Sequence, residues 1–517
     1  MTSQTIIEPA PNRTMIMISI MLATIMTALD TTIANVALPH MAGSVSASAD
    51  QITWVLTSYI IATAIVTPMT GWLAGRLGRK QVFLISIIGF TLASALCGAA
   101  QSLEQIVLFR VLQGVFGAAM MPLSQAVMLD TYSLKERGPV MAIWGMGVMV
   151  APIVGPVLGG WLTDDLSWRW VFYINLPVGA LCVVGIMTFI HEQKHEQKIP
   201  FDVMGFALLS TALAALQIFL DRGQSNDWFQ SSEILIEATV AGLALFLFVV
   251  HTFTVRRPYL PVELLGDRNF VTATLLGLAV GLLVFSVLAL LPPMLQTLLG
   301  YPVLTTGIVT APRGIGSVIS MFLAGRLVGR FDTRLIIIAG LGLFAVAFFG
   351  MSDFSPQMDA SMIVWTGFVQ GLGTGLVFMP MTTLAFATLD PSLRADGAGV
   401  STLVRSLGNS AGISIMQAMY TRNVEVVHSR LVEPLRPDNP FARAPYLPGP
   451  FSLTDPRGLA ALNGAVNRQA SMVAYIDVFH VMALATLAMI PLVLLLRKPT
   501  DQIADPGIVD DDMVFAE

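Results

Sequence analysis

The sequence predicts an all-α membrane protein that crosses the bilayer many times. Of its 517 residues, 55% are hydrophobic and only 12% are charged, and the mean hydropathy is +0.73. A soluble domain of ordinary composition carries about twice this share of charge. The apolar residues form runs of roughly 20, the length of a helix that crosses a bilayer core of about 30 Å. This pattern excludes an ordinary soluble domain.

Fourteen apolar runs are bounded by charged residues, glycine or proline, and each predicts one transmembrane helix. They cover residues 15–38, 52–73, 82–100, 105–129, 139–162, 170–190, 203–220, 234–255, 271–292, 305–328, 335–351, 361–388, 397–420 and 477–496. The first run is too long for the apolar part of a signal peptide and is interrupted by Asp30. We therefore expect it to be retained as a helix.

The basic residues predict that both termini lie in the cytoplasm, because cytoplasmic loops of membrane proteins collect lysine and arginine. With this orientation the inside segments hold seventeen of the 28 basic residues, and the short outside loops hold only Arg169 and Arg222. The net charge is −5, and no basic stretch is interleaved with aromatic residues. Nothing therefore indicates a nucleic-acid partner.

Repeated segments predict two related halves. The sequence AGRLGR at residues 74–79 returns as AGRLVGR at residues 324–330. Likewise, SLKERG at residues 133–138 returns as SLRADG at residues 392–397. Many secondary transporters consist of such halves, with the binding site between them near the middle of the bilayer.

The repeats and the apolar runs together predict the domain organisation. It comprises a six-helix bundle at residues 1–195, two extra transmembrane helices at 196–260, a second six-helix bundle at 261–500 and a disordered acidic tail at 501–517. The second bundle contains a long extracytoplasmic loop at about 421–476, which includes seven prolines. Two interpretations of this loop stay open, a disordered spacer and a docking element for a partner.

Asp30 is the first candidate for a functional residue because it lies well inside the first predicted span. A charged side chain at the centre of a bilayer costs on the order of 3 kcal/mol on insertion scales. A carboxylate whose surroundings alternate between wet and dry can bind and release a proton, so we predict proton coupling at Asp30. The alternative is a structural partner for a neighbouring helix.

Arg110 is the predicted partner of Asp30. It shares one face of the fourth span with Gln113, since the two are three residues apart. An arginine in that position keeps its charge, so it can balance the ionised form of Asp30. Arg313 and Arg405 in the second half compete for this role.

The fifth span predicts a closely packed, bent helix. Its small residues recur at every fourth position, which forms a smooth ridge for another backbone, and its two prolines each remove a backbone donor. The residues are Gly147, Ala151, Gly155 and Gly159 on the ridge, with Pro152 and Pro156.

The loop GWLAGRLGRK at residues 71–80 predicts a gate on the cytoplasmic side. Its glycines permit a tight turn, and its cations can meet helix C-termini or carboxylates in one conformation only. The candidate residues are Gly71, Arg76, Gly78 and Arg79. The alternative is simple anchoring by positive charge. The sequence has no phosphate-binding loop, nucleophile motif or metal-ligand spacing, so we expect no enzyme activity, cofactor or metal.

Several of these stretches resemble the major facilitator superfamily. GWLAGRLGRK, LFRVLQGVFGAA at residues 108–119 and the fifth-span run resemble three of its motifs, although Gly75 replaces the acidic residue that is usual in the first. LDTTIANVALP and WRWVFYINLPVG resemble signatures of the 14-helix drug:proton antiporter branch. LDRGQSNDWFQSSEI at residues 220–234 is similar to the EmrB-type multidrug exporters of Gram-negative bacteria.

The resemblance implies a major facilitator fold with 14 helices arranged as six, two and six. It also implies a proton-driven antiporter in the bacterial inner membrane that exports hydrophobic or amphipathic drugs from the cytoplasm or inner leaflet. Membrane lipids, a periplasmic adaptor and an outer-membrane channel are the implied partners. Asn35, Gln113, Gln370 and Arg405 are the residues then expected along the substrate pathway. A dedicated exporter of one metabolite, lipid or siderophore, and a membrane sensor without transport, are the alternatives.

Overall fold

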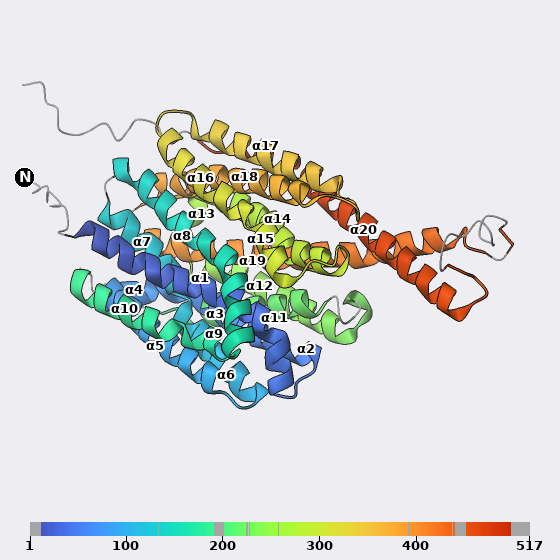
Figure 1. Ribbon diagram of the computed structural model, residues 1–517. Helices are drawn as coiled ribbons and strands as arrows, with labels where there is room; N and C mark the ends of the chain where they lie inside the picture. Colours follow the sequence, from blue (N-terminus) through green and yellow to red (C-terminus); the bar gives the residue numbers. More distant parts are fainter. Residues whose placement is uncertain are drawn as a thin grey trace, which may run out of the picture.

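The computed structural model describes residues 12–132, 134–190, 201–223, 226, 228–256, 258–390, 393–436, 438–439 and 451–497. In this part of the chain the regular elements are helices, apart from one isolated bridge between Val328 and Phe331. Figure 1 shows most of the long helices side by side in one bundle. The prediction of an all-α protein is confirmed.

The first ten helices span the predicted first bundle. They are α1 (Arg13–Ser44), α2 (Ala49–Ile52), α3 (Trp54–Val66), α4 (Thr70–Leu77), α5 (Arg79–Ala99), α6 (Leu103–Gly117), α7 (Met120–Thr131), α8 (Leu134–Trp161), α9 (Trp170–Tyr173) and α10 (Asn175–Phe189). Short turns η1 (Thr67–Met69) and η2 (Leu162–Leu166) adjoin α3 and α8. The break between α3 and α4 contains Pro68, which has no backbone N–H to continue the helical hydrogen bonds.

The rest of the described chain also consists of helices joined by short connections. They are α11 (Val203–Arg222), α12 (Ser232–Thr254), α13 (Glu263–Gly266), α14 (Arg268–Thr297), α15 (Val303–Thr310), α16 (Pro312–Leu327), α17 (Thr333–Ser352), α18 (Ala360–Ala387), α19 (Arg394–Val432), α20 (Pro456–Ala488) and α21 (Ile490–Val493), with η3 (Trp228–Gln230) before α12. The predicted span 305–328 is divided into α15 and α16 where Pro312 occupies the first helical position.

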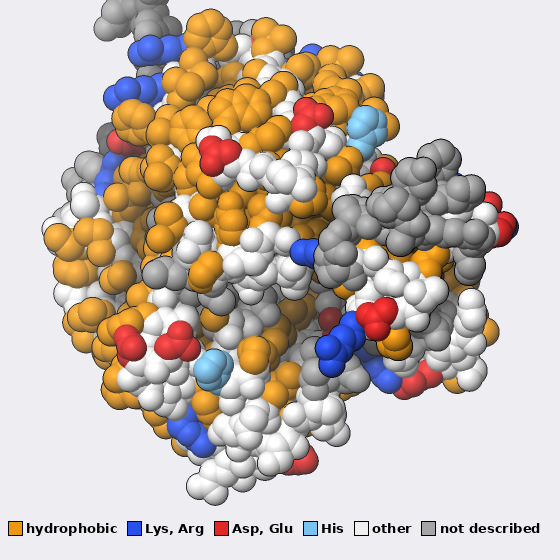
Figure 2. Space-filling model, turned by 45° about the vertical axis from the view of Figure 1, so that its right-hand side comes forward, with side chains coloured by type: hydrophobic (Ala, Val, Ile, Leu, Met, Phe, Trp, Pro, Cys, Tyr) orange, Lys and Arg blue, Asp and Glu red, His pale blue; other side chains and the backbone are white. Residues whose placement is uncertain are grey.

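The helix lengths are compatible with the predicted fourteen spans. Twelve helices or joined helix pairs in the described chain are long and apolar enough to cross a membrane. Two further helices, α8 with 28 residues and α19 with 39, cover the two predicted spans that remain. Large apolar side chains such as Leu92, Leu181 and Phe246 are exposed on the outside of the bundle, and apolar side chains cover much of the face in Figure 2. Such a surface suits contact with lipid.

The helices form two groups and a connecting pair. In the first group α1 packs against α8 and α10, and α3 packs against α6. In the second, α14 packs against α19, and α18 against α16 and α17. Helices α11 and α12 pack on each other, and α11 contacts α3 and α19, one from each group. Ser414 Oγ on α19 donates a hydrogen bond of 2.6 Å to the carbonyl of Leu220 on α11.

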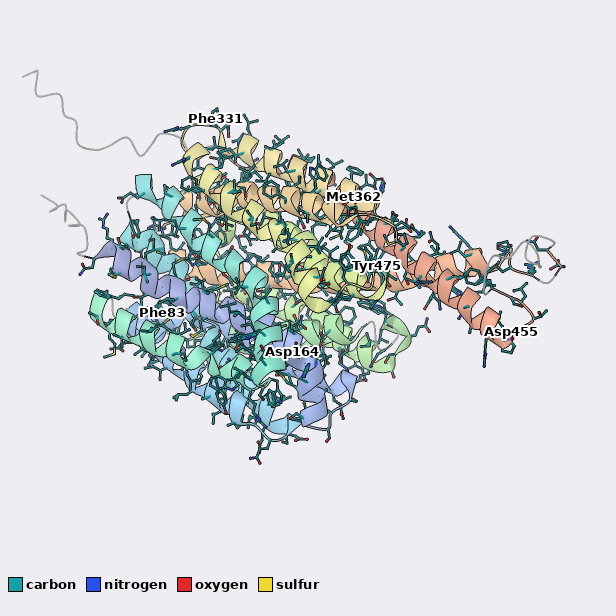
Figure 3. The ribbon with its side chains drawn as sticks, viewed as in Figure 1. Phe83, Asp164, Phe331, Met362, Asp455 and Tyr475 are labelled. Carbon is teal, nitrogen blue, oxygen red and sulfur yellow. The ribbon has the colours of Figure 1, made fainter. Side chains whose placement is uncertain are left out.

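The predicted long loop at 421–476 is shorter than expected. Helix α19 continues to Val432 and α20 begins at Pro456, so helices cover most of this segment, and their ends project from the bundle (Figure 1). Asp455 at the tip of α20, labelled in Figure 3, caps the helix. Its carboxylate accepts a hydrogen bond of 2.9 Å from the Gly458 N–H. Hydropathy missed these turns because they are polar: Asn423 of α19, for example, donates to Asp477 of α20. The predicted acidic tail lies outside the described residues.

The two ends of the bundle differ in a way that fits the predicted orientation. Phe331 follows α16 in a loop that the charge pattern places in the cytoplasm, and it lies towards the end where α1 begins (Figure 3). Asp455, in the segment predicted to be outside, lies at the opposite end (Figure 3).

Candidate functional site

A buried polar cluster joins three helices of the first group around Asp30 of α1. Arg110 Nη1 of α6 donates to Asp30 Oδ2 at 2.6 Å. Gln113 Nε2 of α6 and Asn175 Nδ2 of α10 donate to Asp30 Oδ1 at 2.8 and 2.9 Å. Asp30 is 1% exposed, and Arg110 is fully buried. The ionised carboxylate therefore has three donors, one of them charged, which is the kind of pairing a buried charge needs.

The partners of Asp30 are themselves held in place. Arg110 Nε donates to the Val55 carbonyl at 3.0 Å, and Arg110 Nη1 also donates to Gln113 Oε1 at 2.7 Å. Asn175 Nδ2 also donates to Ser94 Oγ of α5 at 2.9 Å. The spacing of three residues puts Arg110 and Gln113 on the same face of α6. Arg110 Nη2 has no hydrogen-bond partner in the described chain, so both of its N–H groups are unused.

Tyr59 of α3 separates this cluster from the centre of the molecule. Its ring lies 4.2 Å from Arg110 Cζ, a distance suited to a cation–π interaction. Tyr59 also lines a central cavity, whereas Asp30 and Arg110 do not. A ligand in the cavity would therefore meet the Tyr59 ring before it could reach the ion pair.

The central cavity has a volume of about 330 Å³ and lies between the two groups of helices. Its apolar wall is rich in methionine and aromatic side chains and comes from both groups. Members of this wall are Tyr59, Met121, Met141, Trp144, Phe285, Met321, Phe378 and Met379. Its polar part includes threonine hydroxyl groups from α1 and α3, together with Arg405 and Asn409 of α19.

The small residues of α8 face α1. A Cβ atom added at Gly155 would overlap the Thr32 side chain, and one at Gly159 would lie 3.2 Å from the Ile33 carbonyl oxygen. Thr32 Oγ1 donates to the carbonyl of the buried Ala151 at 3.2 Å. The backbones of α1 and α8 thus approach closely beside Asp30.

Gly147, Pro152 and Pro156 belong to the same fifth-span motif, but they give weaker evidence of close packing against α1. A Cβ atom at Gly147 would overlap the end of Met21, a flexible side chain that can move. Pro152 and Pro156 lie within α8, but their side chains lie outside the described part of the chain.

The segment around α4 joins the two groups at the predicted cytoplasmic end. A Cβ atom at Gly71 would overlap the carboxylate of Asp396, which lies in the first turn of α19. Arg79 at the start of α5 forms an ion pair with Asp130 of α7. Arg394 Nη1 of α19 lies 3.6 Å from the other oxygen of Asp130. One carboxylate therefore connects cations from both groups.

The other gate residues have different roles. Gly78, between α4 and α5, has φ of 89°, a conformation that favours glycine. Arg76 is exposed, and its guanidinium lies 5.3 Å from the Trp72 ring. No carboxylate of the described chain lies within ion-pair distance of it. A Cβ atom at Gly75 would have no neighbour within 4 Å.

Comparison with known sequences identifies the family. The sequence profile described as Major Facilitator Superfamily matches residues 20–413. The chain belongs to this superfamily. It is 36% identical over 486 residues to "Multidrug export protein EmrB" of Escherichia coli (strain K12), which covers 93% of this chain and 95% of that protein. It is 34% identical to "Fatty acid resistance protein FarB" of Neisseria gonorrhoeae, over 93% of this chain and 96% of that protein.

Solved structures of superfamily transporters show the same fold. The human organic anion transporter MFSD10 (TETRAN) matches with a TM-score of 0.58 and 15% identity, over 92% of this chain and all of that chain. A bacterial homologue of the human lysosomal transporter Spinster, in an inward-facing conformation, matches with a TM-score of 0.53 and 18% identity, over 95% of this chain and 99% of that chain. The predicted major facilitator fold is confirmed. The protein is a multi-pass transporter of the bacterial inner membrane, not an enzyme.

Of the residues predicted along the substrate pathway of this superfamily member, some line the central cavity and others do not. Arg405 lines the cavity. Gln113 belongs to the Asp30 cluster instead, and Gln370 is fully buried and accepts from Arg313 Nη1 at 3.5 Å. Asn35 is exposed on α1 and is not among the residues that line this cavity, so its place along the pathway stays a prediction. It lies five residues after Asp30, about 140° around a helix of 3.6 residues per turn.

Sequence reasoning missed Asn175 and Tyr59. Asn175 is an amide inside an apolar run, and it belongs to the stretch WRWVFYINLPVG that resembles an antiporter signature. An intramembrane polar residue is a reason to look for a partner, and this one could have been paired with Asp30 on that ground. Tyr59 gave no comparable signal, since a tyrosine in an apolar helix is common.

The contact at Gly71 leads to a prediction about access to the cavity. Gly71→Ala should push α4 away from Asp396, and an overpacking cost of about 1–3 kcal/mol would open the cytoplasmic end roughly tenfold more often. The measurement is the rate at which a cysteine at Thr402, which lines the cavity, reacts with an impermeant thiol reagent in inside-out vesicles. Gly75→Ala is the matched control and should not change this rate. Equal rates in both variants would contradict the role of Gly71.

Proposed function

We propose that this protein is a proton-driven antiporter that exports hydrophobic or amphipathic drugs from the cytoplasm or the inner leaflet. The observation that carries the proposal is the buried ion pair between Asp30 and Arg110, 2.6 Å apart inside a transporter fold. The likeness to relatives named for multidrug export supports it, because it extends over 93% of the chain. A buried titratable group beside a substrate cavity is a reasonable candidate for coupling.

In the proposed cycle the proton binds to Asp30. In the conformation described here, Arg110, Gln113 and Asn175 all donate hydrogen bonds to the Asp30 carboxylate. Protonation removes the negative charge and weakens the bond to Arg110, whose guanidinium stays charged. Tyr59 contacts both the cavity and Arg110, so a substrate that moves this ring also alters the ion pair.

The energy available for export is sufficient without ATP. A charge that crosses the membrane gains about 2.3 kcal/mol per 100 mV. At about 150 mV, one entering proton therefore supports a substrate gradient of roughly 300-fold.

The cavity wall supports a broad choice of substrates. Flexible thioether side chains such as Met121, Met321 and Met379 adapt to ligands of different shape, and aromatic rings supply large apolar contacts. A dedicated exporter of one metabolite, lipid or siderophore would need polar groups arranged for that compound.

We also propose a periplasmic adaptor and an outer-membrane channel as partners. The support is the projection of α19 and α20 beyond the bundle (Figure 1), which offers a surface outside the predicted membrane region. Cross-linking from a cysteine at Asn463, which faces His428 across this pair, should capture an adaptor in intact cells.

Efflux from cells tests the proposed function. Cells that express the protein should keep several unrelated hydrophobic compounds at low internal concentration, and a protonophore should abolish this difference. Export of a single compound from a broad panel would favour the dedicated exporter. Export that persists when the proton gradient has collapsed would contradict proton coupling.

A further inference from the structure

Arg405 gives the central cavity a positive charge that forms no ion pair within the described part of the chain. It is the only charged side chain among the cavity-lining residues that the structure describes. Its guanidinium lies 5.7 Å from the Phe378 ring, and the described chain places no carboxylate within ion-pair distance of it. Arg110 is different, because Asp30 lies 2.6 Å from it.

Asp30 cannot balance Arg405 in this conformation. Its two oxygens already accept bonds from Arg110, Gln113 and Asn175, and Asp30 itself does not line the cavity. A charge that is removed from bulk water is costly unless it is paired. The missing partner can come from a ligand.

We propose that the cavity selects anionic amphiphiles, with Arg405 binding the acidic group and the apolar wall holding the hydrophobic body. A guanidinium binds a carboxylate or sulfonate through paired, charge-assisted hydrogen bonds. Trp144, Phe285 and Met321 are the apolar groups available for the body. The volume of 330 Å³ is at the small end of the range of about 300–1,000 Å³ for ligand pockets. The inference rests on the proposed function, since it names the class of compound exported.

Two dyes with one shared ring system provide the test. Anilinonaphthalene sulfonate is an anion, and N-phenyl-naphthylamine is the neutral compound without the sulfonate. Binding of each to the purified full chain in detergent is measured by equilibrium dialysis against protein-free micelles. Arg405→Gln should weaken binding of the sulfonate at least about tenfold, whereas binding of the neutral dye should change less than about twofold. Arg405→Lys, which keeps the charge, should retain most of the sulfonate binding.

Arg313→Gln is the matched control. Arg313 is another arginine in the membrane region; it is partly buried, contacts Gln370 and does not line the cavity. Its replacement should leave the binding of both dyes unchanged. An equal loss of sulfonate binding in this variant would show that the effect of Arg405→Gln does not depend on the cavity.

A second variant, Asn409→Asp, keeps Arg405 and balances its charge with an added carboxylate. Asn409 lies four residues further along α19 and also lines the cavity. Asn409→Asp places a carboxylate one turn from Arg405 at almost unchanged side-chain volume, and it should weaken sulfonate binding to a similar extent. If Arg405→Gln does not yield folded protein by gel filtration and thermal melting, this variant decides the question.

The outcomes separate this proposal from the proposed function. Unchanged sulfonate binding in folded Arg405→Gln, or an equal loss for both dyes, would overturn the charge preference. These measurements use no proton gradient. A protein without proton coupling could therefore still show the charge preference, and a coupled exporter could lack it.

Discussion

Asp30→Asn should abolish proton-driven export while substrate binding persists. Asparagine has nearly the same shape as aspartate but cannot take up the proton, and it leaves the fully buried Arg110 without its counter-charge. Removal of one partner from a buried ion pair typically costs about 3–5 kcal/mol, so the variant should also melt at a lower temperature. The measurement is substrate-induced proton movement into proteoliposomes, followed with a pH-sensitive dye.

The double variant Asp30→Asn with Arg110→Gln separates the two roles of the pair. It removes both charges, so it should recover much of the lost stability. If Asp30 were only a structural partner, this double variant would also recover transport. Recovery of stability without proton movement is the result that we expect, and proton movement at the wild-type level in either variant would remove Asp30 from the coupling mechanism.

Gly155→Leu should reduce transport to background. A Cβ atom alone would overlap the Thr32 side chain, and the backbone nitrogen of Ile33 lies only 3.6 Å from that position. A leucine would have to separate α8 from α1, close to Asp30. Extra side-chain volume in a tight interface costs typically 1–3 kcal/mol or more, and here it would also disturb the ion pair. Substrate efflux and thermal stability of the purified variant are the quantities to measure.

Gly160→Leu is the control on the same helix. A Cβ atom at Gly160 would have no neighbour within 4 Å, so a side chain there points into open space. Transport and stability should stay close to those of the wild type. Full activity of Gly155→Leu, or an equal loss in Gly160→Leu, would contradict the close-packing interpretation.

Much of the fold could be predicted because the bilayer imposes simple rules. Long apolar runs predict spans, and a charge inside such a run is expensive enough to need a partner. The pairing of Asp30 with Arg110 follows from these rules, since few charged residues lie inside the first six spans. Arg313 and Arg405 in the second half competed for this role, and the packing of the helices decides in favour of Arg110.

The rest depended on contacts that hydropathy does not encode. The polar turns of α19 and α20 lacked an apolar run and were predicted as loop. Asn35 is exposed on α1, and hydropathy does not show whether such a side chain faces lipid or a transport path. The family resemblance placed Gln113 and Gln370 along the pathway, but it does not distinguish a cavity wall from a buried hydrogen-bond network.

The most direct test of the account uses purified protein in sealed proteoliposomes with an imposed pH gradient or membrane voltage. With the same vesicles and substrate, we expect substrate movement opposite to proton flow. This movement should increase with either driving force and be lost in Asp30→Asn. Substrate movement that is the same with and without the gradient and the voltage would contradict it.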